Sequence, residues 1–185
     1  MKTALSSGIF TIAQFFSPEE CLAYIARSEG AGYEAATIQT QDGAVLDTQI
    51  RNNERLILDD AELARQLWER LQPHLPKMMT GRQAIGLNEC FRFYRYEPGQ
   101  YFAPHSDGSF RRDNGEESRL TVLFYLNDDF EGGETAFTEL VVQPEKGMAL
   151  VFRHELIHEG RTVTSGAKYV LRSDVMFNPV GRITG

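Results

Sequence analysis

The chain has 185 residues, of which 42% are hydrophobic and 24% are charged, as in globular domains that bury a core without disulfides. Its 26 acidic residues outnumber its 19 lysines and arginines, and the formal net charge is −7. This balance disfavours a nucleic-acid partner, which needs a surface that neutralises phosphates. The two cysteines, Cys21 and Cys90, are too few for a disulfide framework.

The first twenty residues bear on cellular location. They carry one lysine and a broken apolar run with no small-residue cleavage site, which is atypical of a signal peptide. No stretch of the sequence approaches the roughly 20 apolar residues of a membrane span. The sequence therefore predicts a cytoplasmic protein without a membrane partner.

Two helices are predicted, both in the first half of the chain. Ser17 is followed by Pro18 and by a glutamate three positions after the serine, which is the pattern of a capped helix start. A second helix is predicted over residues 59–76, with prolines at its end. The apolar residues expected to pack are Leu22, Ile25 and Ala26 in the first helix, and Leu63, Leu67, Trp68 and Leu71 in the second.

From residue 89 onward the apolar pattern changes to period 2. The segments 89–96, 118–127, 147–152 and 167–177 are rich in aromatic and β-branched residues, and Gly/Pro turns separate them. Many short strands without intervening helices predict an antiparallel sandwich or barrel. We therefore expect a mainly β protein with N-terminal helices: one domain over 1–185, in which a helical and β region, 1–87, supports a β core, 88–177.

Residues 154–158 spell H-E-x-x-H, the zinc signature of many metalloproteases. That motif needs a helix, because only the i, i+4 geometry places both histidines on one face. Here it follows a strand-like segment, and Gly160 and a β-branched run come soon after. Beyond Glu159 the chain has no Glu or His to serve as a third ligand. A zinc peptidase is therefore only a remote alternative.

A second candidate metal site begins with "APHSDG", where His105 and Asp107 stand at i and i+2. On a strand these side chains would project from one face and could offer an imidazole and a carboxylate to one cation. One distant histidine would complete the two-histidine, one-carboxylate set of non-haem Fe(II) oxygenases. That set leaves coordination positions open for a co-substrate and O₂.

The surrounding sequence carries a family resemblance. The run "FYRYEPGQYFAPHSDG", then "LTVLFYLND", "GGETAF", "KGMALVF" and "HEGRTVTSGAK", resembles the catalytic domain of the prolyl 4-hydroxylase-type Fe(II)/2-oxoglutarate dioxygenases over about residues 88–177. The resemblance implies a double-stranded β-helix, or cupin-like jelly roll. It implies the iron ligands His105, Asp107 and His158, with 2-oxoglutarate and O₂ as co-substrates and ascorbate as reductant.

The resemblance also implies a binding site for 2-oxoglutarate. Lys168 stands at the family's basic position, and a dianion in a partly dry barrel requires such a fixed cation. Tyr125 matches a tyrosine that shares the same carboxylate. The other residues expected in this pocket are Tyr96, Thr121, Leu123 and Thr135.

Several residues depart from the family pattern or lie outside the matched region, and we consider them for substrate binding. Phe102 replaces a common tyrosine, and the tryptophan that often follows the lysine is missing. Arg92 and Arg172 are predicted to face inward, where they either pair with internal acids or bind substrate. Arg51 and Asn53 could rim the site.

Three further features are open or peripheral. His154 is expected at the end of a strand, and Glu155 is expected to point to solvent. The polar segment 108–118 fits either a mobile lid or a solvated loop.

The resemblance implies a dioxygenase that couples decarboxylation of 2-oxoglutarate, to succinate and CO₂, to the hydroxylation of an organic substrate. A prolyl residue in a protein or peptide is the implied substrate. A free amino acid or other small metabolite is the alternative. A non-catalytic jelly-roll binding module is a more remote one.

Overall fold

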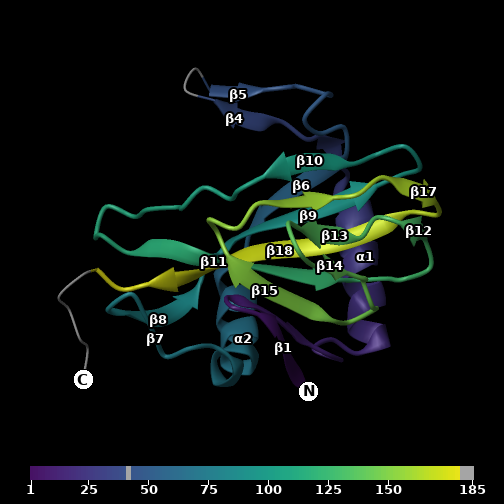
Figure 1. Cartoon of the computed structure of the whole chain (residues 1–185). Helices are drawn as coiled ribbons and strands as arrows, with labels where there is room; N and C mark the ends of the chain where they lie inside the picture. Colours follow the sequence, from purple (N-terminus) through teal and green to yellow (C-terminus); the bar gives the residue numbers. More distant parts are fainter. Residues whose placement is uncertain (41–42, 180–185) are drawn as a thin grey trace.

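The computed structural model describes residues 1–40 and 43–179 (Figure 1). Helix α1 (Pro18–Ala31) begins as predicted, because the Ser17 hydroxyl accepts a hydrogen bond from the Glu20 amide while the Glu20 carboxylate accepts one from the Ser17 amide. This reciprocal pair satisfies two amides that a helix start leaves without partners. The capping box is confirmed.

The buried face of α1 differs from the prediction. Leu22 is 59% exposed and Ala26 is also exposed, whereas Cys21 and Ser28 are buried and Ile25 is partly buried. Residues seven apart lie on the same face of a helix, so Cys21 and Ser28 define the buried face. Leu22 is the next residue after Cys21, and its side chain therefore points toward solvent. The prediction was wrong for Leu22 and Ala26.

Helix α2 (Ala61–Leu71) is shorter than predicted and continues as the 3-10 turn η1 (Gln72–His74). Pro73 has no amide hydrogen to extend the helical hydrogen bonding. The predicted apolar stripe of α2 is confirmed, since Leu63, Leu67 and Leu71 are buried against the sheet. Neither α1 nor α2, in the described part of the chain, has the length and apolar character of a membrane-crossing helix.

Ten strands of the described residues form the larger sheet. They are β1 (Lys2–Ser6), β2 (Ile9–Ile12), β3 (Glu34–Ala35), β6 (Glu54–Asp59), β7 (Met78–Met79), β8 (Arg82–Leu87), β9 (Cys90–Tyr96), β11 (Glu117–Tyr125), β15 (Ala149–Arg153) and β18 (Lys168–Phe177). The order is β1-β2-β15-β11-β18-β9-β6-β3, with β8 beside β18 and β7 beside β8. The long strands β11, β18 and β9 therefore lie at its centre.

A smaller sheet and two ribbons complete the β structure. The smaller sheet contains β10 (Phe102–His105), β13 (Thr135–Phe137), β14 (Val141–Val142) and β16 (His158–Gly160), in the order β10-β16-β13-β14. The two ribbons are β4 (Ile38–Thr40) with β5 (Gly43–Val45), and β12 (Glu131–Gly132) with β17 (Val163–Ser165). The four segments predicted as strands correspond to β9, β11, β15 and β18, which confirms those predictions.

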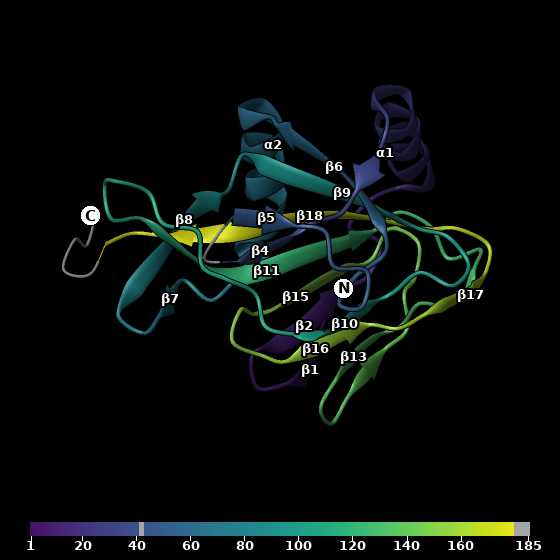
Figure 2. The same cartoon turned by 90° about the horizontal axis from the view of Figure 1, so that it is seen from above.

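The two faces of the larger sheet have different neighbours. Figure 2 shows α1 and α2 on one side of β9, β18 and β11, and the strands β10, β16 and β13 on the other. Because side chains alternate along a strand, Phe91 and Phe93 of β9 pack toward the helices, whereas Tyr94 and Tyr96 pack in a second cluster toward the smaller sheet. The fold therefore has two cores, one on each face of the larger sheet.

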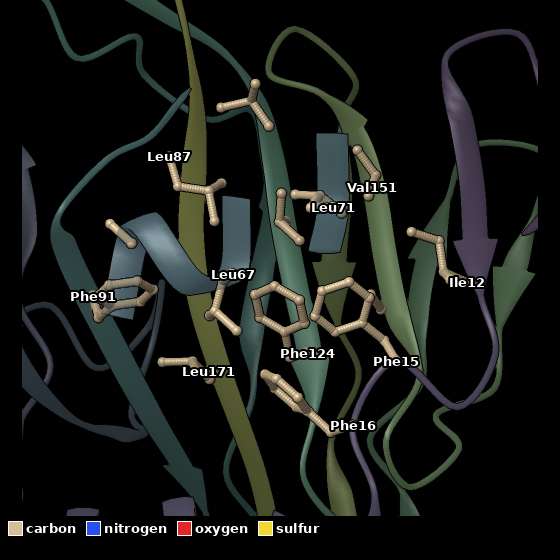
Figure 3. Close-up of a cluster of buried hydrophobic side chains, with 14 of the residues drawn as sticks. Ile12, Phe15, Phe16, Leu67, Leu71, Leu87, Phe91, Phe124, Val151 and Leu171 are labelled. Atoms are coloured by element: carbon tan, nitrogen blue, oxygen red, sulfur yellow. The ribbon is translucent and has the colours of Figure 1, made fainter. Parts of the chain in front are cut away.

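Aromatic rings fill the core between the helices and the larger sheet (Figure 3). The ring of Phe124 lies 5.0 Å from that of Phe15 and 4.9 Å from that of Phe16, centroid to centroid. Leu67 and Leu71 of α2 close the cluster and are at most 1% exposed. Truncating a buried phenylalanine such as Phe124 to alanine typically costs about 3 to 5 kcal/mol. This core holds the larger sheet rigid behind its other face.

Candidate metal centre and the pocket beside it

The alternation of side chains along the three central strands decides which residues face the smaller sheet. Leu123 of β11 stands opposite Arg172 of β18, and Arg172 stands opposite Arg92 of β9. Residues two apart from these share their face. The residues on this face are Arg92, Tyr94 and Tyr96 of β9, Thr121, Leu123 and Tyr125 of β11, and Lys168, Val170, Arg172 and Asp174 of β18. They form the floor beneath the smaller sheet.

The three predicted metal ligands lie close together above this floor. One nitrogen each of His105 and His158 and one carboxylate oxygen of Asp107 all lie within 4.8 Å of one another. His105 ends β10 and His158 begins β16, and the two are paired across these strands. The antiparallel pairing thus brings together two histidines that are far apart in the sequence.

Asp107 is not on a strand, contrary to the expectation for the H-x-D motif. Strand β10 ends at His105, and the Asp107 amide donates a hydrogen bond to the carbonyl of His154 at 2.9 Å. This contact between two loops, rather than strand alternation, places the carboxylate beside the imidazoles. The predicted proximity is observed for a different geometric reason.

Hydrogen bonds to the backbone set the tautomer of both histidines. Nδ1 of His105 lies 2.8 Å from the carbonyl oxygen of Ala103, and Nδ1 of His158 lies 3.0 Å from that of Leu156. A carbonyl can only accept, so each Nδ1 carries the proton and each Nε2 keeps its lone pair. The Nε2 atoms lie 3.8 Å from the carboxylate oxygens of Asp107. Both imidazoles therefore direct a free lone pair toward the same point.

Burial adjusts the protonation of these groups for metal binding. It lowers the pKa of His105 to about 4 and also lowers the pKa of His158. Burial alone would raise the pKa of Asp107, but Arg172, His158 and the Thr121 hydroxyl together hold the pKa of that carboxyl well below its usual range. At neutral pH the cluster thus contains two neutral imidazoles and one carboxylate. These are the forms that bind a metal ion.

The donor set fits Fe(II). Two imidazole nitrogens and one carboxylate oxygen are the ligands of non-haem Fe(II) sites with open positions, and all three residues have a suitable protonation state. Structural zinc sites usually have four protein ligands. His105, Asp107 and His158 could therefore hold Fe(II) and leave room for a co-substrate.

Lys168 lies in the adjacent pocket as a buried cation. Its side chain is 3% exposed, and its ammonium donates a hydrogen bond to the carbonyl of Gly133 at 2.6 Å. The ammonium also lies over the rings of Tyr96 and Tyr125, at 5.1 and 5.6 Å from their centroids. Burial lowers the pKa of Lys168 to about 7. In the described part of the chain no carboxylate forms an ion pair with it, so the site suits an anionic ligand.

A glycine makes the approach of Lys168 possible. Gly133 has a φ of +66°, and a Cβ there would lie 3.2 Å from Cδ of Lys168 and 3.0 Å from the side chains of Phe130 and Val163. A side chain at this position would be strained and would crowd the lysine. The pair of glycines in "EGGETAF" therefore has a steric role beside the pocket.

Most of the residues predicted to bind 2-oxoglutarate line one pocket. Tyr96, Leu123, Thr135 and Lys168 line it together with Phe102, His105 and His158. Tyr125 lies just behind, and its hydroxyl is 2.7 Å from that of Thr135. Thr121 is fully buried, and its hydroxyl donates to Asp107 at 2.5 Å. Thr121 thus contacts a candidate metal ligand and does not line the pocket.

Both inward arginines form ion pairs with internal acids. Arg172 contacts Asp107 at 2.7 Å and Asp174 at 3.2 Å, and Arg92 contacts the other oxygen of Asp174 at 3.3 Å. Of the two alternatives that the sequence left open, the observed contacts are those of internal pairing. Arg172 still lines the pocket.

Arg51 does not lie on an open rim. It is 4% exposed, and its guanidinium donates two hydrogen bonds to the side-chain oxygen of Asn53, at 3.0 and 2.9 Å. The guanidinium lies 4.1 Å from the centre of the Phe102 ring, which stacks on the His105 ring at 3.5 Å. Arg51, Asn53 and Phe102 therefore form one wall beside His105.

The H-E-x-x-H motif adopts no helix. His154 and Glu155 lie in a turn after β15, and His158 begins β16. The Glu155 side chain is 56% exposed and pairs with Arg153, as expected for a residue that points to solvent. Because His154 is outside the cluster of His105, Asp107 and His158, the geometry does not support the zinc peptidase.

Sequence reasoning missed Ser118 and Asp174. Ser118 contacts His154, and Asp174 joins the two arginines. For Asp174 a signal was present, since it follows Arg172 by two residues and so shares its face. For Ser118 no local pattern indicated a partner, because the contact joins a strand to a distant turn.

Comparison with known proteins agrees with this site. Residues 91–173 match the family model described as the 2OG-Fe(II) oxygenase superfamily. The match covers slightly less than half of the chain, and over this part the chain is similar to that superfamily. The match contains all three candidate metal ligands and Lys168. The superfamily implies Fe(II), 2-oxoglutarate and O₂ as the metal and co-substrates, and the chain is similar to dioxygenases of the prolyl 4-hydroxylase type.

Proteins similar to this chain include plant and bacterial hydroxylases. Prolyl 4-hydroxylase 1 of Arabidopsis thaliana is 26% identical over 191 residues, which cover 89% of this chain and 67% of the relative. A PKHD-type hydroxylase of Paraburkholderia phymatum is 28% identical over 182 residues, covering 86% of this chain and 74% of the relative. For prolyl 4-hydroxylase 5 of Arabidopsis thaliana, the match spans only 42% of the relative's length.

Solved structures confirm the fold. The viral collagen prolyl hydroxylase of Paramecium Bursaria Chlorella virus-1, in complex with 2OG, superposes with a TM-score of 0.65 at 22% identity, covering 94% of this chain and 99% of that one. A Pseudomonas putida prolyl-4-hydroxylase gives a TM-score of 0.67 at 19% identity, with 91% of each chain covered. The predicted mainly β jelly roll with helices in the first half is confirmed.

Proposed function

We propose that this protein is an Fe(II)- and 2-oxoglutarate-dependent oxygenase that hydroxylates a prolyl residue in a protein or peptide and releases succinate and CO₂. Most of the similar proteins are named prolyl 4-hydroxylases, and a structural neighbour from Trichoplax adhaerens was solved with a peptide fragment of hypoxia inducible factor. These comparisons favour a peptide over the alternative of a free amino acid or small metabolite. Ascorbate as reductant and a cytoplasmic location belong to the proposal and rest on the sequence alone.

The observation that carries the proposal is the placement of Lys168 in the same pocket as His105 and His158. The lysine is buried and without an ion pair among the described residues, whereas the cluster of His105, Asp107 and His158 suits a metal. A dicarboxylate can engage a cation at one end and a metal at the other. We therefore assign Lys168 to the far carboxylate of 2-oxoglutarate.

The other residues of the site would hold the metal, bind the co-substrate or exclude water. His105, Asp107 and His158 would hold Fe(II), which when bound supplies the redox chemistry with O₂. Tyr125 and Thr135, whose hydroxyls are 2.7 Å apart, add polar groups near Lys168. The Phe102 ring shields His105 by stacking on it at 3.5 Å. These groups bind and orient the co-substrate and limit the access of water.

Substrate-dependent turnover tests the proposal. The protein, reconstituted with Fe(II), is incubated with 2-oxoglutarate, ascorbate and a library of proline-containing peptides, and succinate release is followed together with a mass gain of one oxygen atom. Matched peptides with alanine in place of proline are the control, and the Asp107→Ala variant measures metal-independent background. Oxygen incorporation into free amino acids but into none of the peptides would establish the alternative instead.

A further inference from the structure

His154, which the proposed function leaves without a role, lies at the centre of a buried hydrogen-bonded chain. The imidazole is 4% exposed. Its Nδ1 lies 2.9 Å from the hydroxyl of Thr121, and its Nε2 lies 2.9 Å from the hydroxyl of Ser118. Both ring nitrogens are thus engaged by strand β11, whose other face belongs to the hydrophobic core.

The direction of each hydrogen bond follows from the available protons. The Thr121 hydroxyl donates its single proton to Asp107, whose carboxylate can only accept. Nδ1 of His154 must therefore carry a proton and donate it to Thr121. A neutral imidazole then accepts at Nε2 from Ser118, whose oxygen in turn accepts the Phe110 amide at 2.8 Å. Every donor and acceptor in this series has a partner when the hydrogen bonds run from the Phe110 amide to the Asp107 carboxylate.

The backbone of His154 reinforces the same placement. Its carbonyl accepts the Asp107 amide at 2.9 Å, and its own amide donates to the carbonyl of Arg119 at 3.1 Å. The turn that contains His154 is therefore fixed to β11 and supports Asp107 through both its backbone and its side chain. Asp107 needs this support because it lies beyond the end of β10.

The second oxygen of Asp107 is held independently. Nη1 of Arg172 lies 2.7 Å from Oδ1, whereas Thr121 contacts Oδ2. Each oxygen thus has a protein partner other than the histidines, and the carboxylate is 3% exposed. These two contacts fix the orientation of the carboxylate.

We propose that His154 is a positioning residue of the metal centre. Through Thr121 it orients the Asp107 carboxylate, and through Ser118 it links that ligand to the segment that follows the H-x-D motif. The inference rests on the proposed function in one respect, namely that His105, Asp107 and His158 form a metal centre. Outer partners of this kind typically change metal affinity by about 10- to 100-fold.

Metal binding to the metal-free protein tests the proposal without any turnover. We expect His154→Leu and Thr121→Val to weaken Mn(II) binding, measured by titration calorimetry, by about 10- to 100-fold. His154→Asn keeps an amide donor near the position of Nδ1, so this conservative variant should recover most of the affinity. Thr11→Val is the matched control, because Thr11 is buried on β2 of the same sheet and should leave Mn(II) affinity unchanged.

The visible absorption of bound Co(II) separates positioning from general destabilisation, because it reports the arrangement of the ligands. Both Thr121→Val and His154→Leu should alter the Co(II) spectrum, whereas Thr11→Val should not. Wild-type affinity and spectrum in these two variants would show that His154 has no positioning role. If the wild-type protein itself bound neither Mn(II) nor Co(II), the metal centre, and with it the proposed function, would be wrong.

Discussion

The guanidinium of Arg172 lies 2.7 Å from the carboxylate of Asp107, in a buried ion pair between the middle of β18 and the candidate metal centre. Asp174 contacts Arg172 on the same strand and Arg92 on the neighbouring strand. Charges of alternating sign therefore run from β9 to the metal ligand. The positive charge of Arg172 compensates the Asp107 carboxylate in the metal-free protein, and this relationship leads to the first prediction.

Arg172→Met is expected to lower the free energy of unfolding by about 3 to 5 kcal/mol in the absence of metal, because it leaves a buried carboxylate without its partner. Saturating Mn(II) should restore part of this loss, since the metal then supplies positive charge beside Asp107. Urea denaturation with and without Mn(II) measures both effects. Arg161→Met, which breaks an exposed pair with Glu159, is the control. Equal losses in the two variants would contradict the prediction.

Lys168→Met should weaken the binding of 2-oxoglutarate by about 2 to 5 kcal/mol, because a charged carboxylate then lacks its partner in a sheltered pocket. Mn(II) affinity should change little, since Lys168 is not a candidate ligand. Calorimetric titration of the Mn(II)-loaded protein with 2-oxoglutarate checks this, with the exposed Lys77→Met as the control. If Arg172→Met caused the loss and Lys168→Met did not, the basic residue would be wrongly assigned.

Binding of 2-oxoglutarate should take up a proton above about pH 7. Burial lowers the pKa of Lys168 from 10.5 to about 7 in the free protein, and a bound dianion raises it again by favouring the charged form. Affinity should therefore fall as the pH rises through about 7. Calorimetry at about pH 8 in buffers of different ionisation enthalpy counts the protons, and Lys168→Met should abolish the uptake.

The same shift affects stability with a definite sign. Between about pH 7 and 10.5 the unfolded chain binds more protons at Lys168 than the folded chain does. Burial of Lys168 therefore lowers the free energy of unfolding by its full amount below pH 7. This destabilisation becomes smaller as the pH rises toward 10.5. If the free energies of unfolding of wild type and Lys168→Met differed by the same amount across this pH range, that result would argue against a neutral buried lysine.

Glu155→Gln should leave 2-oxoglutarate turnover within a few-fold of wild type, because this exposed carboxylate pairs only with Arg153 among the described contacts. Asp107→Ala should abolish turnover, since it removes one of three candidate ligands. In a zinc peptidase the glutamate would be the general base, whose loss typically costs a factor of about 10² to 10⁴. Assays of both variants for 2-oxoglutarate turnover and for peptide cleavage distinguish the two chemistries.

The main strands of the β core and the inward direction of Arg92 and Arg172 were predictable from the amino-acid pattern. Arg172 was predicted to face inward, and alternation along residues 168–177 places it on the same face as Lys168, toward the pocket. These predictions succeeded because strand periodicity is a local property. The capping box at Ser17 was predictable for the same reason, whereas the buried face of α1 was not, because packing against the sheet decides it.

The partners of the inward polar residues depend on contacts between segments that are distant in the sequence. Asp107 lies beyond its strand and is placed by the carbonyl of His154, and Arg172 pairs with that carboxylate from a strand far along the chain. Such contacts depend on how loops and sheets pack, and in a buried site each charge or donor must find whichever partner the fold brings near. In the sequence His154 is therefore part of a zinc-binding pattern. In the fold its imidazole contacts Thr121, which in turn contacts the candidate metal ligand Asp107.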